Sequence, residues 1–307
     1  MTQDSLPRVH GNRIRNGRGD TLFDVVLHIL LAFAVIVTFY PLYFVLIASV
    51  SDPMYVNSGA FLLYPKGFTA IGYKRVFADV RIWTGYANTL LYAACGTALG
   101  VAATVMAGYS LSRSDLPGRG LIMKLLVFTM YFGGGLIPFY MLVDGLGLVN
   151  SRLLMVILGS VSVYNIIIVR SFFVSSIPGE LHDAACVDGC SNQRFFFSIV
   201  LPLSKPILAV IALYLAVGYW NAYFNPMIFL TDVKKFPLQL YLREILLTAK
   251  TNESAVGLDA EAALKLETMV EVVKYGVIVV STLPILCVYP FLQKYFVKGV
   301  MIGSIKG

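Results

Sequence analysis

The residues best suited to chemistry lie in one polar stretch, residues 177–189, which separates two long apolar runs. The stretch combines carboxylates with small apolar side chains and a closing glycine: Glu180, Leu181, Asp183, Ala184, Ala185, Asp188 and Gly189. Carboxylates in the first turn of a helix interact favourably with the positive end of the helix dipole. Small side chains let the backbone of another protein approach closely. This combination predicts a short helix that binds a soluble partner.

Two residues indicate the limits of this helix. Pro178 suits the first turn, where its missing N–H leaves no hydrogen bond unmade. Gly189 suits the position after the last helical residue, where a left-handed backbone is common. Leu181, Ala184 and Ala185 follow one another at i, i+3 and i+4 and are expected to form one face. In the alternative interpretation, the helix packs only on its own membrane domain.

A metal site is a further alternative for the same stretch. His182, Cys186 and Cys190 fall at i, i+4 and i+8, and Asp183 follows the histidine directly. Such side chains bind zinc. However, Gly189 is expected to end the helix before Cys190, and the sequence offers no second ligand pair. We therefore predict no metal here.

Polar side chains within the fifth apolar run are candidates for contact with a transported solute. Tyr214, Gly218, Asn221 and Asn225 recur at i, i+4, i+7 and i+11. This spacing places them on one face of a continuous helix. Amides and aromatic rings suit the hydroxyls and C–H faces of sugars. Hydrogen bonding between neighbouring helices is the alternative role for such residues in a membrane.

Two further positions are predicted to line the same path. Asn88 shares a face of the second apolar run with Tyr92. Gly134 lies in a glycine triplet, residues 133–135, which precedes Pro138 and should weaken the third helix. Irregular backbone at membrane depth occurs where it is buried in protein or lines a cavity. Close helix packing through small residues is the alternative.

The apolar runs that hold these residues identify an integral membrane protein. Charged residues make up 13% of the chain, against about 25% in an average soluble domain. Six runs are long enough to cross ~30 Å of hydrocarbon as helices. They are residues 22–49, 85–111, 121–143, 153–174, 199–230 and 272–296. We predict an all-α protein with six transmembrane helices in one membrane domain, residues 22–298, flanked by tails at residues 1–21 and 299–307.

Basic residues predict the orientation. Residues 1–21 contain four arginines, and the loop 112–120 contains two. Such positive segments remain in the cytoplasm, so both termini and the loop 177–202 are predicted to be cytoplasmic. The loop 231–271 also contains Lys and Arg, but long loops follow this rule poorly. Within it, residues 236–242 are expected to form a short amphipathic helix on the outer surface.

We attribute the net charge of +7 to these basic segments. The sequence contains no basic run with interleaved aromatic residues of the kind that would indicate nucleic-acid binding. The sequence lacks the G-x-x-x-x-G-K-[ST] phosphate loop. Its three histidines form no apparent catalytic set with Asp and Ser. We therefore predict a non-catalytic transport subunit that binds no cofactor directly, with ATP and Mg used by a separate ATPase.

The loop 177–202 resembles the EAA loop, through which the membrane subunits of ABC importers dock on their ATPase. The matching residues are Glu180, Ala184, Ala185, Asp188, Gly189, Ile199, Leu201 and Pro202, with Asp183 in place of the usual second Glu. Residues 88–89, 107–113 and 295–307 are similar to the MalG-type subunits of the carbohydrate branch. Residues 132–138 are similar to the subset that serves polysaccharide-derived oligosaccharides.

The resemblance implies a type I ABC importer permease (MetI-like) fold in the inner (plasma) membrane of a bacterium. It also implies the partners: a second homologous permease, two ATPase subunits, an extracytoplasmic solute-binding protein and an oligosaccharide. Closure of the ATPases on ATP would then drive alternating access. The same architecture importing an amino acid, phosphate or a metal chelate remains an alternative. An ion-coupled carrier or a membrane enzyme is a second alternative.

Overall fold

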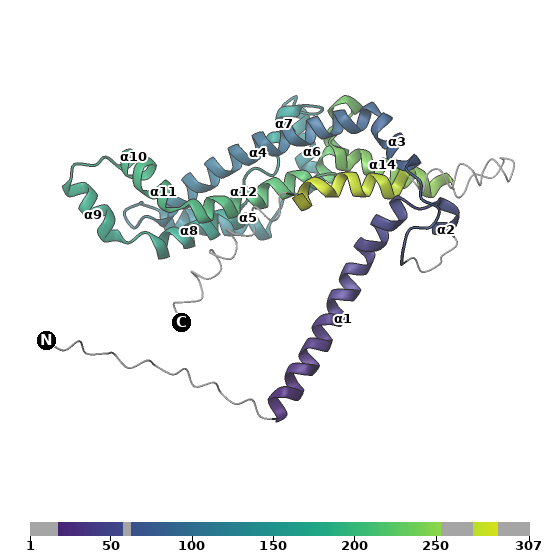
Figure 1. Cartoon of the computed structure of the whole chain (residues 1–307). Helices are drawn as coiled ribbons and strands as arrows, with labels where there is room; N and C mark the ends of the chain where they lie inside the picture. The colour runs from purple at the N-terminus through teal and green to yellow at the C-terminus, as the bar shows by residue number, and fades with distance from the viewer. Residues whose placement is uncertain (1–17, 58–62, 253–272, 288–307) are drawn as a thin grey trace.

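The described chain consists of helices packed into one elongated body, from which the first helix diverges (Figure 1). The computed structural model describes residues 18–57, 63–252 and 273–287, and these ranges contain no β-strand. The all-α prediction is confirmed for this part of the chain. The tail 299–307 and most of the tail 1–21 lie outside the described residues, and helix begins at Arg18 rather than at residue 22.

The first half of the chain contains α1 (Arg18–Ser49), α2 (Pro53–Asn57), α3 (Ile71–Ala78), α4 (Val80–Ser112), α5 (Arg119–Tyr131), α6 (Leu136–Gly145) and α7 (Arg152–Ile157). The second half begins with α8 (Val163–Ser176), α9 (Gly179–Val187), α10 (Asn192–Phe195), the π-helical turn η1 (Phe196–Val200) and α11 (Leu201–Leu203). It continues with α12 (Lys205–Trp220), α13 (Phe224–Phe229), the 3-10 turn η2 (Val233–Lys235), α14 (Leu238–Asn252) and the helix Val273–Cys287.

The central helix of the body is α4, which packs against α8 on one side and α12 on another. Glycines on α4 allow this close approach. A Cβ at Gly100 would lie 2.3 Å from the Ser160 backbone oxygen, and one at Gly108 would lie 2.6 Å from Val169 Cγ1. Both contacts are shorter than side chains allow, so a larger residue at Gly108 would force α8 away from α4, and one at Gly100 would displace the segment that precedes α8.

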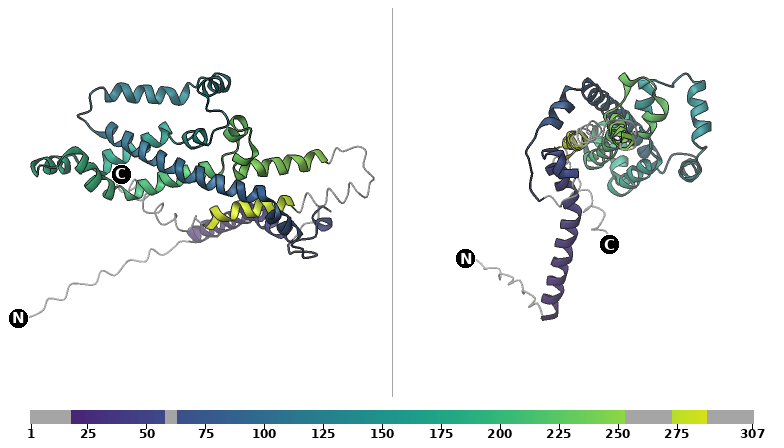
Figure 2. Two further views of the ribbon diagram at one scale, coloured as in Figure 1. Left: turned by 90° about the horizontal axis from the view of Figure 1, so that it is seen from above. Right: turned by 90° about the vertical axis from the view of Figure 1, so that its right-hand side faces the viewer.

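By contrast, α1 has almost no packing within the described chain. No residue of its most apolar window is buried, and α1 diverges from the body in Figure 1 and in the right-hand view of Figure 2. Only its last turn is buried, where Ile47 and Ala48 contact Val56. The Ser49 hydroxyl lies 2.8 Å from the Tyr73 hydroxyl and completes this anchor.

The third and fourth predicted spans are broken. The helices α5 and α6 meet at an angle of 111°, and Gly135 between them has φ +83°. The prediction that the glycine triplet weakens the third helix is therefore confirmed. Residues 158–162 separate α7 from α8, and Gly159 in this gap has φ +86°.

The fifth predicted span, 199–230, is wrong as one continuous helix. Its two main segments, Asn192–Leu203 and Lys205–Trp220, are bent by 78°, and the helix then ends before α13 starts. Pro202 and Pro206 flank the bend and lack the N–H that a continuous helix requires. At the bend, the Val200 carbonyl accepts from both the N–H and the buried hydroxyl of Ser204, at 3.1 and 2.7 Å.

The predicted count of six spans is not confirmed. By length and composition, two described helices can cross a membrane, one within α1 (Leu22–Ser49) and α4, or up to four if each bent pair is one span. Two further apolar helices, α8 and Val273–Cys287, are shorter. The predicted sixth span continues to residue 296, beyond the described residues.

Candidate functional site

The polar stretch forms α9, which lies at one end of the elongated body, whereas α3 and α14 lie at the other (Figure 1). Pro178 occupies the position before the first helical residue, with an extended backbone at φ −61° and ψ 146°. Its carbonyl accepts from the Leu181 N–H at 3.2 Å. The predicted start of the helix is thus confirmed to within one residue.

The end of α9 is a Schellman motif built on Gly189. The glycine has φ +71°, and its N–H donates to the Cys186 carbonyl at 3.0 Å. The Cys190 N–H donates to the Ala185 carbonyl at 2.9 Å. A left-handed residue that closes two such bonds is the usual C-terminal cap, so the predicted role of Gly189 in the backbone is confirmed.

The two sides of α9 differ from the predicted arrangement. Leu181 and Ala185 pack inward, against a core that includes Phe173 and Phe195. Ala184, expected on the same face as these two residues, is exposed. The expectation of one small-residue face is therefore wrong, because aromatic side chains from α8 and α10 cover part of it.

The exposed side of α9 is a stripe at i, i+3, i+4 and i+7, formed by Glu180, Asp183, Ala184 and Val187. We call these four residues the α9 stripe. Val187, which the structure shows to be 89% exposed, was not among the residues predicted from the sequence. Asp188 and Gly189 extend this exposed surface beyond the helix. Two carboxylates around small apolar side chains suit a basic partner surface with an apolar centre.

The histidine on α9 makes a polar contact with α10. His182 Nε2 lies 3.1 Å from Asn192 Oδ1, and its ring packs edge-on against Phe195 with centroids 5.1 Å apart. Cys186 Sγ lies 3.7 Å from the ring nitrogens. Among the described residues, no group of three or more His, Cys, Asp or Glu side chains is arranged to bind a metal.

A cleft of about 480 Å³ adjoins α9, between it and the ends of α4 and α8. Its rim carries Arg113, whose guanidinium donates to both carboxylate oxygens of Asp115 at 2.8 and 2.7 Å. This pair holds the pKa of Asp115 at about 2. Arg119 and Arg170 donate to backbone carbonyls at the end of α4, the latter to Leu111 at 3.1 Å. The loop after α4 is therefore fixed beside α9.

The proposed path residue Asn88 is buried and bonded within the protein. Its amide nitrogen donates to the carbonyls of Lys234 and Phe236 at 2.8 and 3.0 Å. One turn further along α4, the Tyr92 hydroxyl donates to the Lys235 carbonyl at 2.8 Å. These bonds attach the η2 turn to α4. Asn88 therefore makes hydrogen bonds within the protein, which is the alternative to a role in the path.

The predicted stripe on the fifth span divides at the end of α12. Tyr214 and Asn221 are exposed on α12 and at its end, and Asn221 Nδ2 donates to the Val217 carbonyl at 3.0 Å. Asn225 follows a break in the helix and lies half-buried beside a cavity of about 20 Å³. The single four-residue face is therefore wrong, because helical spacing does not continue across the break.

The remaining predicted path residue, Gly134, lies in the bend between α5 and α6. A Cβ added there would meet no atom within 4 Å. Close packing of a neighbouring described helix therefore does not explain the glycine. Its role in a path stays a prediction.

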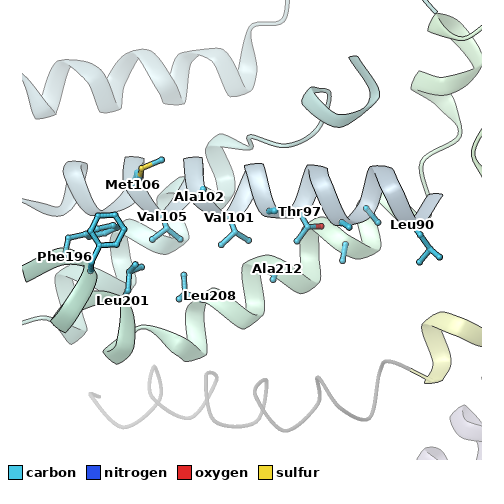
Figure 3. Close-up of a pocket in the computed structure, with 15 residues that line it drawn as sticks. Leu90, Thr97, Val101, Ala102, Val105, Met106, Phe196, Leu201, Leu208 and Ala212 are labelled. Carbon is cyan, nitrogen blue, oxygen red and sulfur yellow. The ribbon is translucent and has the colours of Figure 1, made fainter. Parts of the chain in front are cut away.

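A groove of about 690 Å³ runs between α4 and α12 (Figure 3). Its lining is aliphatic and aromatic, with the Thr97 hydroxyl as the polar side-chain group. Small residues such as Ala94, Ala98 and Ala212 form much of it. Sugar hydroxyls need several hydrogen-bonding partners, and the Thr97 hydroxyl alone does not supply them, so the groove suits hydrocarbon or another helix better than a sugar.

Comparison with known proteins places this geometry among transport proteins. The profile of one family, described as "Binding-protein-dependent transport system inner membrane component", matches residues 9–302. The polygalacturonan/rhamnogalacturonan transport system permease protein YtcP of Bacillus subtilis (strain 168) is 36% identical over 286 residues, which are 93% of this chain and 99% of the relative. Protein LplC of the same strain is 36% identical over 295 residues, covering 96% of this chain and 98% of the relative.

A more distant relative and a solved structure extend the comparison. The maltodextrin transport system permease protein MdxG of Bacillus subtilis (strain 168) is 31% identical over 291 residues, 93% of this chain and 97% of the relative. A crystal structure of a bacterial ABC transporter involved in the import of the acidic polysaccharide alginate contains a similar chain. The TM-score is 0.82 at 33% identity, with 92% of this chain and 99% of that chain covered.

Proposed function

This chain belongs to the family of binding-protein-dependent transport system inner membrane components, and we propose that it is a permease subunit of an ATP-driven oligosaccharide importer. In this role it forms half of the translocation path and catalyses no reaction itself. The family match over residues 9–302 carries the proposal. Relatives named for polygalacturonan and maltodextrin, and the alginate importer structure, support a carbohydrate cargo.

In this proposal α9 is the coupling helix, and the loop 177–202 docks on the ATPase. The α9 stripe supports this role, because it presents Glu180 and Asp183 beside the small side chain of Ala184. Leu181 and Ala185 hold the other side of α9 against the membrane domain. Asp188 and Gly189 complete the contact at the end of the helix. ATP and Mg are bound by the ATPase, so the permease needs no cofactor of its own.

The proposed assembly contains a second homologous permease, two ATPase subunits and an extracytoplasmic solute-binding protein. It lies in the inner membrane of a bacterium, with α9 and both tails in the cytoplasm and the six-span domain at residues 22–298. The exposed apolar length of α1 is available for lipid or for the second permease. The binding protein would meet the opposite end, around α3 and α14.

For the path itself we propose the polar residues of the fifth span, Tyr214, Asn221 and Asn225, together with Asn88 and Gly134. The exposure of Tyr214 and Asn221 supports direct contact with cargo. Asn88 acts differently in this scheme, because its amide donates to the backbone around η2. It would hold the wall of the path in position.

The test is a reconstituted complex in proteoliposomes, assayed for ATP-dependent uptake of acidic and neutral oligosaccharides. Cross-linking tests the docking surface in the same preparation, after replacement of the four natural cysteines. Val187→Cys should cross-link to the ATPase, whereas the control Val233→Cys, an exposed valine on the η2 turn, should not. Uptake of amino acids or phosphate instead of sugars would refute the cargo, and uptake without an ATPase would refute the whole proposal.

A further inference from the structure

A repeated side-chain arrangement in this chain is an arginine that meets both a tyrosine and an aspartate. The Arg81 guanidinium lies 4.6 Å from the centre of the Tyr241 ring, and it donates to Asp79 Oδ1 from Nε and to Asp79 Oδ2 from Nη2. The Tyr241 hydroxyl bonds the same carboxylate. The planar guanidinium matches a carboxylate through two parallel N–H···O bonds.

The arrangement recurs beside α9. Arg113 contacts the Tyr109 hydroxyl at 3.5 Å and forms two bonds with Asp115. In both examples the arginine is positioned by the tyrosine and neutralised by the aspartate.

The third arginine of this type, Arg243 on α14, has the tyrosine without a carboxylate. Its guanidinium lies 5.6 Å from the centre of the Tyr223 ring, and Nη1 contacts Met227 Sδ. No Asp or Glu of the described residues lies within ion-pair distance of it. Arg243 is half-buried, so water hydrates its charge only in part. A half-buried cation favours an anionic partner.

The position of this pair favours a ligand as that partner. Tyr223 is 45% exposed and lies in the break between α12 and α13, two residues after Asn221. The helix α14, which carries Arg243, packs on α13 at the end of the body opposite α9 (Figures 1 and 2). An exposed ring, an amide and a guanidinium thus gather at the end where cargo enters in the proposed orientation.

We propose that Arg243 and Tyr223 form a binding site for the carboxylate of a uronic acid residue in an acidic oligosaccharide. The guanidinium would take the two carboxylate oxygens, as Arg81 and Arg113 do with aspartate. The Tyr223 ring would stack on the C–H face of the sugar. Asn221 Oδ1 would accept from a sugar hydroxyl. This inference rests on the proposed oligosaccharide import and adds the chemical class of the cargo.

The experiment measures uptake of trigalacturonate and of the neutral maltotriose by the complete complex in proteoliposomes. Arg243→Gln should lower kcat/KM for trigalacturonate at least about tenfold, the effect of losing ~1.4 kcal/mol of a charged hydrogen bond. Arg243→Lys should retain more uptake, because it keeps the charge and loses the planar fork. The matched control is Arg75→Gln, which removes an equal charge from an exposed arginine on α3.

Complex assembly and the thermal unfolding midpoint separate binding from structure. Unchanged values for Arg243→Gln, with selective loss of trigalacturonate uptake, support the site. A lower midpoint with equal loss for both sugars would mean that Arg243 only packs α14 on α13, which overturns the inference. Uptake of maltotriose but not trigalacturonate by the unmodified complex would overturn it as well, while oligosaccharide import stands. Uptake of neither sugar, nor of any other oligosaccharide, would instead count against the proposed function.

Discussion

The sharpest prediction concerns Gly189 at the end of α9, where a left-handed backbone is required. Its φ of +71° costs a residue with a side chain about 1–2 kcal/mol, and a β-branched residue more. An added Cβ would meet no atom of this chain within 4 Å, so steric clash contributes nothing. The effect of Gly189→Val within the subunit is therefore backbone strain alone.

That strain is most easily relieved by unwinding the last turn of α9. Unwinding breaks the bonds from Gly189 to Cys186 and from Cys190 to Ala185. Since α9 has only nine residues, it lies below the length at which isolated helices are stable in water. A penalty of about 1–3 kcal/mol lowers the population of the closed turn roughly 5- to 150-fold. The α9 stripe would then lose its geometry at Val187.

The assay is co-purification of the ATPase with the tagged permease, followed by ATP-dependent uptake. Gly189→Val should reduce co-purification about tenfold or more and abolish uptake, with normal membrane insertion and an unchanged unfolding midpoint. Gly189→Asn is the matched control, because asparagine tolerates the left-handed region, and it should behave nearly as wild type. Wild-type co-purification of Gly189→Val would refute the reasoning. An equal loss of co-purification for both variants would show that the added side chain clashes with the ATPase, and that the backbone conformation does not cause the loss.

Other predictions follow from the same contacts. In intact cells, a membrane-impermeant thiol reagent should miss Cys186, although the residue is exposed; labelling from outside would overturn the orientation. Asn221→Leu should reduce sugar uptake by about 1–3 kcal/mol in kcat/KM with normal assembly, and lost assembly would indicate helix packing instead. Asn88→Leu should lower the thermal unfolding midpoint, because two hydrogen bonds to backbone are lost; an unchanged midpoint would contradict the role of Asn88 in holding the η2 turn on α4. A hydrogen bond from Arg81 lowers the pKa of Asp79 from 3.8 to about 2, so the stability advantage over Asp79→Asn should be complete above pH 3.8 and disappear toward pH 2. An advantage that does not change over this range in thermal unfolding would argue against the pair.

The limits of α9 could be predicted from the sequence because local residues determine them. Pro178 and Gly189 each act within one turn of helix, through a missing N–H and a left-handed backbone. The packed face of the same helix could not be predicted. It depends on Phe173 and Phe195, which approach from α8 and α10 only after the chain has folded.

The predicted stripe on the fifth span failed for a reason that the sequence does contain. Helical spacing from Tyr214 to Asn225 assumes an unbroken helix, but Pro226 lacks an N–H and its ring opposes the carbonyl four residues earlier. That carbonyl belongs to Ala222, which lies in the break at residues 221–223. The partners of Asn88 carry no such local signal, since the carbonyl of Lys234 is 146 residues away.

The packing also bears on how force at α9 could reach the cargo path. Ala185 of α9 shares one core with Val200 of η1, Ile211 of α12 and Val105 of α4. Because protein interiors are close-packed and resist compression, α9 cannot move inward without displacing these neighbours. The bend at Ser204 separates α12 from the helix before it, and the far end of α12 leads to Asn221 and the following break. A push on the α9 stripe would therefore tilt α12 and shift the residues proposed for the path, which gives the proposed coupling a continuous mechanical route through these contacts.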